Sequence, residues 1–209
     1  MELQFYGANC VRITTKKGTV VVDDNLADLG LKSVTKAGDT AVFTLPPAKT
    51  PKDAKLVIAQ PGEYEVSDTS IQGVAARSHM DEAGQKSATM YKIIAEDVRI
   101  AVVGHIYPDL NEEQLEALGT IDVLIIPVGG SGYTLDPVGA LKVIKEIEPK
   151  LIIPTHYADK AVKYEVPQQD LEVALKELSM EPRETVAKLK LKAADFISDV
   201  AQLVILERQ

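Results

Sequence analysis

The chain has 209 residues, of which 45% are hydrophobic and 26% charged, and its 31 acidic and 23 basic residues leave a net charge of −8. This size fits one globular domain, residues 1–209, and the acidic balance disfavours both a nucleic-acid coat and a nucleic-acid partner. We expect no membrane span, because the apolar runs fall short of about 20 residues, and a cytoplasmic location, because a signal-peptide pattern is missing and Cys10 alone forms no internal disulfide.

The first half predicts a series of short strands. β-branched and aromatic residues recur there between turn signals, and Lys16, Lys17 and Gly18 favour a hairpin turn. The predicted strands cover residues 2–5, 10–14, 19–23, 40–44, 56–59, 63–66, 69–76 and 88–94.

The second half alternates strands with helices. Strands are predicted at 98–103, 123–128 and 151–154, with a helix from Asn111 to about Leu118 and another from Pro137 to about Ile147. Asn111 and Asp136 are good N-caps, and Pro137 suits a first helical position. After Pro167, apolar residues in 171–178 predict a further helix, and 185–191 and 202–206 predict a closing pair of strands. This order indicates two packed sheets with helices outside.

Three histidines, the whole complement of the chain, each follow a strand-like segment. His79 follows residues 71–77, His105 follows 100–104 and His156 follows 151–154. Ligand sites of α/β proteins gather at the carboxyl ends of strands, and three imidazoles with a water form a known catalytic zinc site. The spacing does not exclude ordinary structural histidines.

Each histidine also has an oxygen-bearing neighbour. Asp81, Asp109 and Tyr157 lie close in sequence to the three histidines and are candidate catalytic groups. Asp23 and Asp24, at the end of a predicted strand, are either carboxylates that support a metal site or turn residues. Cys10, in an apolar strand, is expected to be buried and inert.

Seven segments together resemble the metallo-β-lactamase fold superfamily, in particular its Zn-dependent hydrolase-like branch, which includes the ascorbate-6-phosphate lactonase-like proteins. The resemblance covers nearly the whole chain and implies an α/β fold, an αββα sandwich of two mixed β-sheets with outer helices and a metal site along one edge. Members that act as hydrolases hold one or two zinc ions. The segments are FYGANCVRI, TVVVDDN, PGEYEV, IQGVAARSHMD, VVGHIYPDLNEEQLEAL, IDVLIIPVGGSGYTLDPVGA and PKLIIPTHY.

The richest ligand source of that family is degenerate in this chain. An HxHxDH loop fixes two metal ions and activates a bridging water. The corresponding residues read LPPAKT, so that Leu45, Pro47, Lys49 and Thr50 stand where the resemblance implies two histidines, an aspartate and a last histidine. None of the four is an ordinary zinc ligand.

The later ligand positions match better. His79 and His156 stand at histidine positions of the family, whereas His105 stands where an aspartate is usual and would not bridge two ions. The glycine-histidine pair near the N-terminus is replaced by Gly7 and Ala8.

Three functions remain open. The favoured hypothesis is a protein that has lost the dinuclear zinc hydrolase site and acts as a non-catalytic binding or scaffold protein, without a cofactor. The alternative is a hydrolase with one zinc ion on His79, His105 and His156, and Asp81 or Asp109 as general base. A third hypothesis is a cofactor-free hydrolase that uses Tyr157 and a carboxylate. Exposed strand edges would allow a homo-oligomer.

Overall fold

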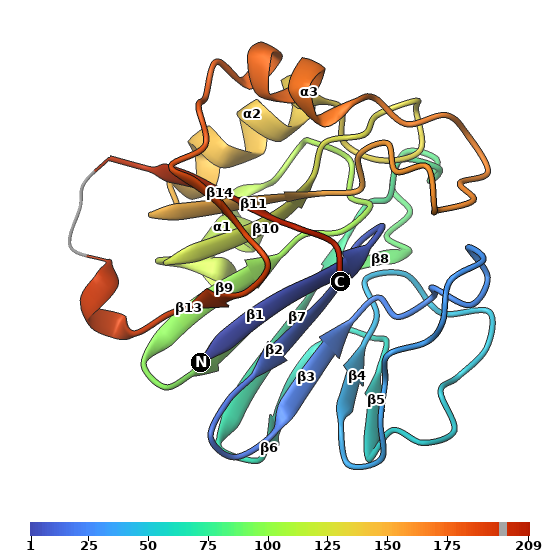
Figure 1. Cartoon of the computed structure of the whole chain (residues 1–209), viewed down its shortest axis with the longest axis vertical. Coiled ribbons are helices and arrows are strands. Elements are labelled where there is room, and N and C mark those ends of the chain that lie inside the picture. Colours follow the sequence, from blue (N-terminus) through green and yellow to red (C-terminus); the bar gives the residue numbers. More distant parts are fainter. Residues whose placement is uncertain (197–199) are drawn as a thin grey trace.

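The computed structural model describes residues 1–196 and 200–209, which form two mixed β-sheets packed face to face (Figure 1). The expected sandwich of two mixed sheets is thereby confirmed. Sheet 1 has the order β13 (Leu189–Lys190), β1 (Glu2–Gly7), β2 (Cys10–Thr14), β3 (Thr19–Val22), β4 (Thr40–Val42) and β5 (Leu56–Ile58). Sheet 2 has the order β12 (Glu184–Val186), β14 (Gln202–Leu206), β11 (Leu151–Thr155), β10 (Val123–Pro127), β9 (Val98–Val102), β8 (Ala88–Ala95), β7 (Thr69–Ala76) and β6 (Gly62–Val66).

The main core fills the space between the two sheets. In β1, Leu3 and Phe5 are buried in this core while the alternate residues are partly exposed, as period-two patterning requires. Strand β10 is buried on both faces, because Val123 points into the same core and Leu124 into a second core beneath the helices. The continuous apolar run of β10 is the expected signature of a central parallel strand.

Three α-helices cover the outer face of sheet 2 (Figure 1): α1 (Glu112–Leu118), α2 (Pro137–Ile147) and α3 (Leu171–Leu178). The predicted caps are confirmed, since Asn111 forms a capping box with Gln114 and the Asp136 side chain accepts a hydrogen bond from the Gly139 N–H. Within residues 1–196 and 200–209, no helix is both long and apolar enough to cross a membrane.

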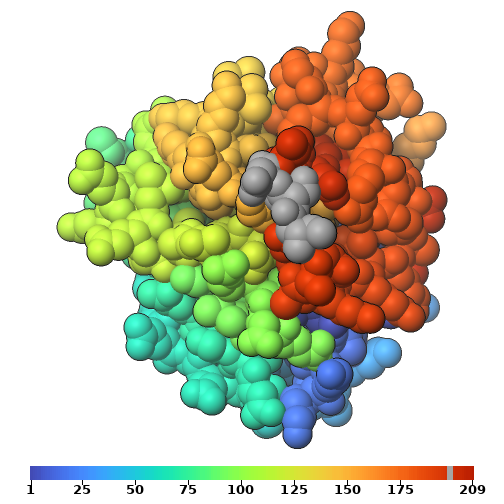
Figure 2. Space-filling model, turned by 90° about the vertical axis from the view of Figure 1, so that its left-hand side faces the viewer, coloured from blue at the N-terminus to red at the C-terminus, as the bar shows by residue number. Residues whose placement is uncertain are grey.

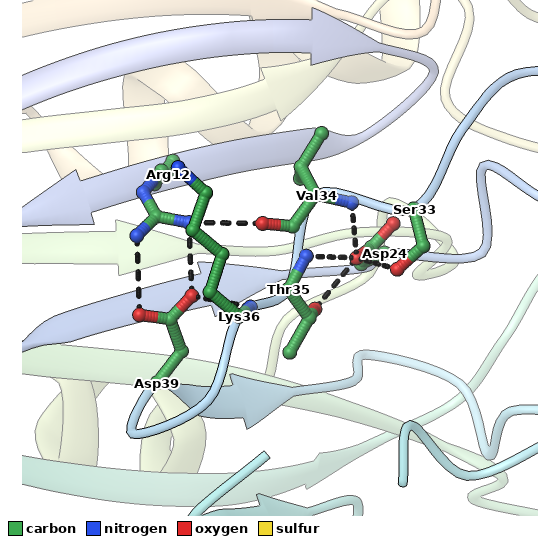
Figure 3. A network of polar contacts seen from close by, with 7 residues as sticks. All are labelled: Arg12, Asp24, Ser33, Val34, Thr35, Lys36 and Asp39. Atoms are coloured by element: carbon green, nitrogen blue, oxygen red, sulfur yellow. Dashed lines mark hydrogen bonds and ion pairs between the residues drawn. The ribbon is translucent and has the colours of Figure 1, made fainter. Parts of the chain in front are cut away.

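The outer face of sheet 1 is covered by the segment between β3 and β4 instead of by a helix. Leu26 of this segment packs on Cys10 and Val21. The Asp24 Oδ2 atom accepts four hydrogen bonds of 2.6–2.9 Å from residues 33–35 (Figure 3). These polar contacts hold an irregular segment against the sheet. The predicted helices therefore lie on one side of the sandwich in the described part of the chain.

The C-terminal strands differ from the prediction. Residues 185–191 were expected to form one strand of a closing pair, but β12 pairs in parallel with β14 in sheet 2, whereas β13 pairs antiparallel with β1 in sheet 1. The chain crosses from one sheet to the other between Val186 and Leu189, so one straight strand cannot serve both. Figure 2 shows the C-terminal part of the chain beside N-terminal residues at this crossing.

Candidate functional site

Five strand ends meet at one edge of the sandwich, and each has a left-handed backbone. Ala8 follows β1 (φ 49°), Asp23 follows β3 (φ 46°) and His156 follows β11 (φ 53°). Gly104 (φ 59°) and Gly130 (φ 72°) follow β9 and β10. Non-glycine residues adopt this conformation only where the surrounding structure imposes it, and such residues cluster at functional sites. The edge is therefore the first place to look for a site.

His156 is held at the end of β11 by hydrogen bonds on both sides. Its backbone N–H donates to Ala8 O (2.8 Å), and its Nδ1–H donates to Gln168 Oε1 (3.1 Å). The Gln168 amide is oriented by its own bond to Val166 O (2.9 Å), so its oxygen must face the imidazole. The imidazole therefore carries its proton on Nδ1, and its Nε2 atom is an acceptor.

Gly129 permits this arrangement by leaving room for His156. A Cβ atom at position 129 would lie 1.9 Å from the His156 carbonyl oxygen and 2.3 Å from Gln168 Oε1. No side chain fits at that distance. Gly129, in the glycine-rich segment after β10, thus has a packing role at the site.

His105 continues a chain of hydrogen bonds that starts at Thr155. The Thr155 hydroxyl donates to Asn9 Oδ1 (2.8 Å), and Asn9 Nδ2 donates to His105 Nδ1 (3.3 Å). His105 Nε2 then lies 3.3 Å from His156 Nε2, and the protons of this chain are consistent if His105 donates. With both imidazoles neutral, each ring nitrogen of His105 and His156 has a hydrogen-bond partner in this series.

Burial keeps these two imidazoles neutral. Desolvation lowers the pKa of His156 to about 4, although the hydrogen bond to Gln168 opposes the shift. Desolvation also lowers the pKa of His105 well below its usual value, and the nearby His156 and His79 lower it further. At pH 7 the pair is therefore uncharged, which is the state needed both for the hydrogen bond and for a metal ligand.

The third histidine is placed differently. The His79 Nδ1–H donates to Ile106 O (2.7 Å) and its ring packs on Tyr107 at 5.5 Å, but His79 is not among the residues that line the cleft at His105 and His156. Across residues 1–196 and 200–209, no group of three or more His, Cys, Asp or Glu side chains is arranged to hold a metal ion. The residues present do not fit a three-histidine zinc site in this arrangement.

The spacing of the remaining pair does suit two ligands of one zinc ion. Two imidazole nitrogens bonded to a tetrahedral zinc at about 2.0–2.1 Å lie about 3.3 Å apart. The His105–His156 distance of 3.3 Å is thus compatible with a hydrogen bond or with half of a zinc site.

A cleft of about 360 Å³ opens beside the pair. Two groups of its lining residues differ in chemistry, and we name them the histidine group and the loop group. The His105 ring lies 5.0 Å from the Tyr133 ring, and the His156 ring 4.9 Å from the Tyr164 ring. The histidine group is His105, Tyr133, His156, Tyr164 and Gln168, and the loop group is Leu45, Pro46, Pro47 and Ala48.

Asp23 joins the cleft to the start of the loop group. Its carboxylate accepts hydrogen bonds from the Thr44 N–H (2.7 Å) and the Thr44 hydroxyl (2.6 Å). Desolvation raises the pKa of Asp23 to about 6, although both bonds from Thr44 oppose this shift. Gly104 packs against Thr44 so closely that a Cβ there would lie 2.1 Å from the hydroxyl oxygen.

The structure does not bring the three candidate catalytic oxygens to the cleft. Asp81 accepts hydrogen bonds from Ser78 and Ser87, which outweigh desolvation and lower its pKa to about 2. Asp109 forms an exposed ion pair with Lys142. Neither carboxylate lines the cleft.

Tyr157 points into the protein instead of the cleft. Its ring packs on Phe5 at 5.8 Å, its hydroxyl donates to Leu206 O (3.4 Å), and desolvation raises its pKa to about 12. Because neighbouring residues at a strand end point in different directions, His156 and Tyr157 do not share a site.

Sequence reasoning missed four residues of the site: Asn9, Tyr133, Tyr164 and Gln168. Asn9 and Tyr133 carried a weak signal, since both lie in loops that follow predicted strands of the resembling segments. Tyr164 and Gln168 lie in the irregular segment before α3, where no pattern distinguished them.

Comparison with known proteins shows the family. A sequence profile described as "Beta-lactamase superfamily domain" matches residues 2–156. A candidate Zn-dependent hydrolase of the metallo-beta-lactamase superfamily from Thermotoga maritima is similar in structure, with a TM-score of 0.77, 24% identity, and coverage of 99% of this chain and 98% of that one. A candidate metal-dependent hydrolase from Parabacteroides distasonis has a TM-score of 0.66 at 16% identity, with coverage of 99% and 93%. Igni18, a metallo hydrolase from Ignicoccus hospitalis, has a TM-score of 0.60 at 16% identity, with coverage of 99% and 94%. This profile match, together with the two mixed sheets, establishes that the chain belongs to the family described as "Beta-lactamase superfamily domain".

Proposed function

We propose that this chain has lost the dinuclear zinc hydrolase site of its superfamily and that its cleft binds a small ligand without hydrolysing it. One observation carries the proposal: the loop group, which stands where the family resemblance implies metal ligands, contributes only leucine, proline and alanine side chains to the cleft. Under this proposal the HxHxDH loop is degenerate, and the relation to the ascorbate-6-phosphate lactonase-like branch is one of ancestry.

The chemistry of the lining supports binding over hydrolysis. Activating a water at neutral pH takes a metal with an open position or a well-placed general base. The His105 and His156 imidazoles have their polar atoms engaged with each other, Asn9 and Gln168. Asp23 lines the cleft, but both of its oxygens accept hydrogen bonds from Thr44. Concave sites with apolar surface and a few fixed polar groups are typical binding sites.

The second candidate is a hydrolase with a single zinc ion. Its specific support is the 3.3 Å spacing of the His105 and His156 Nε2 atoms, together with the Nδ1–H bonds that His79 and His156 donate to oxygen acceptors. Zinc-binding histidines usually make such a bond with the nitrogen that does not bind the metal. On this alternative His79 would have to join the pair, and the catalytic roles of Asp81, Asp109 and Tyr157 would require rearrangement.

Zinc analysis separates the two candidates. Tag-free protein, dialysed against excess zinc and then against buffer, is expected to retain less than about 0.1 zinc per chain and to leave bis(p-nitrophenyl) phosphate unhydrolysed. About one zinc per chain that is lost in both His105→Ala and His156→Ala would establish the zinc site and refute our proposal. The control is Asp97→Asn, an exposed substitution that leaves all histidines in place and should keep the zinc.

Ligand binding needs its own measurement. A panel of small neutral and charged fragments, followed by ¹³C-methyl NMR, is expected to shift the methyl signals of Leu29, Leu45 and Ala48, which line the cleft. Val173, exposed on α3, serves as the control methyl group. A panel that perturbs no cleft methyl group would count against a binding function.

A further inference from the structure

The cleft contains a buried carboxylate that has no cation beside it. Asp23 lines the cleft at the end of β3, is only 5% exposed, and is mostly ionised at pH 7 because its pKa is about 6. Within residues 1–196 and 200–209, no lysine, arginine or histidine forms an ion pair with it. Burying a charge without an opposite charge is costly, so a cation that reaches Asp23 from the cleft is favoured.

The Asp23 carboxylate also has unused acceptor positions. Thr44 donates one hydrogen bond to each of its oxygens, at 2.7 Å and 2.6 Å. An ionised carboxylate offers about two acceptor positions on each oxygen, so one position on each remains for a further donor. Because Thr44 already holds the carboxylate in place, little side-chain freedom is lost when a ligand binds to it.

Tyr133 places a second carboxylate near the same part of the cleft. Desolvation raises the pKa of the Tyr133 hydroxyl, and the negative charges of Glu165 and Asp23 raise it further, so both carboxylates lie near this group. In the described part of the chain the hydroxyl makes no hydrogen bond, although Tyr133 lines the cleft. A phenol oxygen accepts hydrogen bonds from an ammonium group, and a tyrosine ring attracts a cation to its face.

The charges of the lining favour a cation over an anion. Among the described residues that line the cleft, Lys163 is the one cation, against the carboxylates of Asp23, Asp28 and Glu165, and the histidine pair is neutral. The Lys163 stem packs on Gly30, where a Cβ atom would lie 2.9 Å from Lys163 Cδ, and the side chain is exposed. The lining therefore carries a net negative charge that attracts cations.

We propose that the cleft binds a primary ammonium ion with a short apolar body, whose N–H groups contact Asp23 and Tyr133 and whose apolar part packs on the loop group. This inference rests on the proposed binding function and names the class of ligand. The loop group is suitably placed, because its first residue, Leu45, directly follows Thr44, which holds Asp23. A volume of about 360 Å³ suits a small molecule. A quaternary ammonium ion lacks the N–H donors that these acceptors require.

The test compares three compounds of similar shape and different charge. They are phenethylamine, a cation at pH 7, phenethyl alcohol, which is neutral, and hydrocinnamate, an anion. Their Kd values for the full chain are measured by titration of the cleft methyl signals in buffer with EDTA, so that zinc does not bind the amine. We expect a Kd of about 1 mM for phenethylamine and at least about tenfold weaker binding of the other two.

Substitutions then separate charge from shape. Asp23→Asn preserves the size of the side chain and should weaken phenethylamine binding by about tenfold or more, while the Kd of phenethyl alcohol stays within about twofold. At the exposed positions, Glu165→Gln should weaken phenethylamine binding by about twofold, and Lys163→Met should strengthen it by a similar factor. Asp97→Asn, which removes one negative charge at the β8–β9 turn, should leave the Kd unchanged and is the control.

Each contrary result overturns the inference in a recognisable way. If phenethyl alcohol or hydrocinnamate binds as tightly as phenethylamine, the cleft binds ligands but the ammonium class is wrong. Phenethylamine binding that is unaffected by Asp23→Asn would show that the ammonium group lies elsewhere. If Asp23→Asn does not fold, equal or reversed effects of Glu165→Gln and Lys163→Met overturn the inference instead. If none of the three compounds binds, the inference fails, and the fragment panel decides separately whether the cleft binds any ligand.

Discussion

The histidine group and the loop group of the cleft differ in how the fold holds them. His105 and His156 follow β9 and β11, central strands that have buried residues on both faces. The loop group follows β4, a three-residue strand near the edge of sheet 1, and is held by the Asp23–Thr44 contact that precedes it and by the packing of Leu45 on the core beneath the helices. The comparison teaches that core packing maintains strand-end geometry, whereas a surface loop near a sheet edge can exchange its chemistry at little structural cost.

The largest expected effect comes from giving residues 45–50, which include the loop group, the metal ligands that the family resemblance implies. Replacing Leu45, Pro47, Lys49 and Thr50 by His, His, Asp and His should raise zinc content from below about 0.1 to at least one ion per chain, because positions 45 and 47 line the cleft beside the existing pair and the loop then supplies three imidazoles and a carboxylate. Metal analysis after dialysis measures the change. An unaltered zinc content would show that the loop is not the missing part of the site.

Disruption of the histidine group should be the most costly change to stability. Gly129→Ala places a Cβ 1.9 Å from the His156 carbonyl oxygen, so backbone must move, and we expect a loss of about 3–4 kcal/mol in the free energy of unfolding. Urea denaturation measures it. Gly132→Ala is the control in the same segment: nothing lies within 4 Å of its Cβ position, and only its positive φ of 70°, which Gly129 does not share, costs about 1 kcal/mol. Equal losses would contradict the packing argument.

Asp23, whose contact with Thr44 leads to the loop group, and His156 of the histidine group should make opposite contributions to the pH dependence of stability. Asp23 has its pKa raised by burial from 3.8 to about 6, so its protonated form favours folding and stability falls as pH rises from 3.8 through 6. His156 has its pKa lowered by burial from 6.5 to about 4, so it contributes stability above pH 6.5 that is lost as pH falls to 4. The slopes partly cancel in the wild-type chain.

Asp23→Asn removes the Asp23 contribution to the pH dependence of stability and leaves that of His156. The amide can replace both bonds to Thr44, so the variant should fold and should lose only the Asp23 slope, worth about 3 kcal/mol over this range. Stability measured between pH 4 and 7 should then fall more steeply on acidification than in the wild type. An identical pH profile would mean that Asp23 is not a buried titrating group.

The smallest effect tests the orientation of His156. Gln168→Ala removes the acceptor of its Nδ1–H and should cost about 1–2 kcal/mol, with loss of the slowly exchanging Nδ1–H signal in NMR spectra. Gln169→Ala removes only an exposed bond to Glu177 and should stay within about 0.5 kcal/mol and keep that signal. Retention of the signal in Gln168→Ala would refute the assigned tautomer.

Local patterning was sufficient to predict most of the elements. The continuous apolar run of β10, the alternation in β1 and the caps at Asn111 and Asp136 depend on near neighbours and on burial that strand or helix period reveals. The prediction for 185–191 was wrong because the residues of β12 and β13 are equally strand-like, and nothing local says that they join different sheets.

The same division applies to the candidate site. The positions of His105 and His156 at strand ends follow from local sequence, and the absence of ordinary zinc ligands from LPPAKT can be read directly from the chain. That His105 and His156 meet, while His79 bonds to Ile106 and Tyr157 points into the core, depends on packing between segments far apart in sequence. Local sequence determines which segments become strands or helices, because the spacing of apolar residues matches the period of each element. Which side chains meet is decided by how the two sheets stack and where each strand ends.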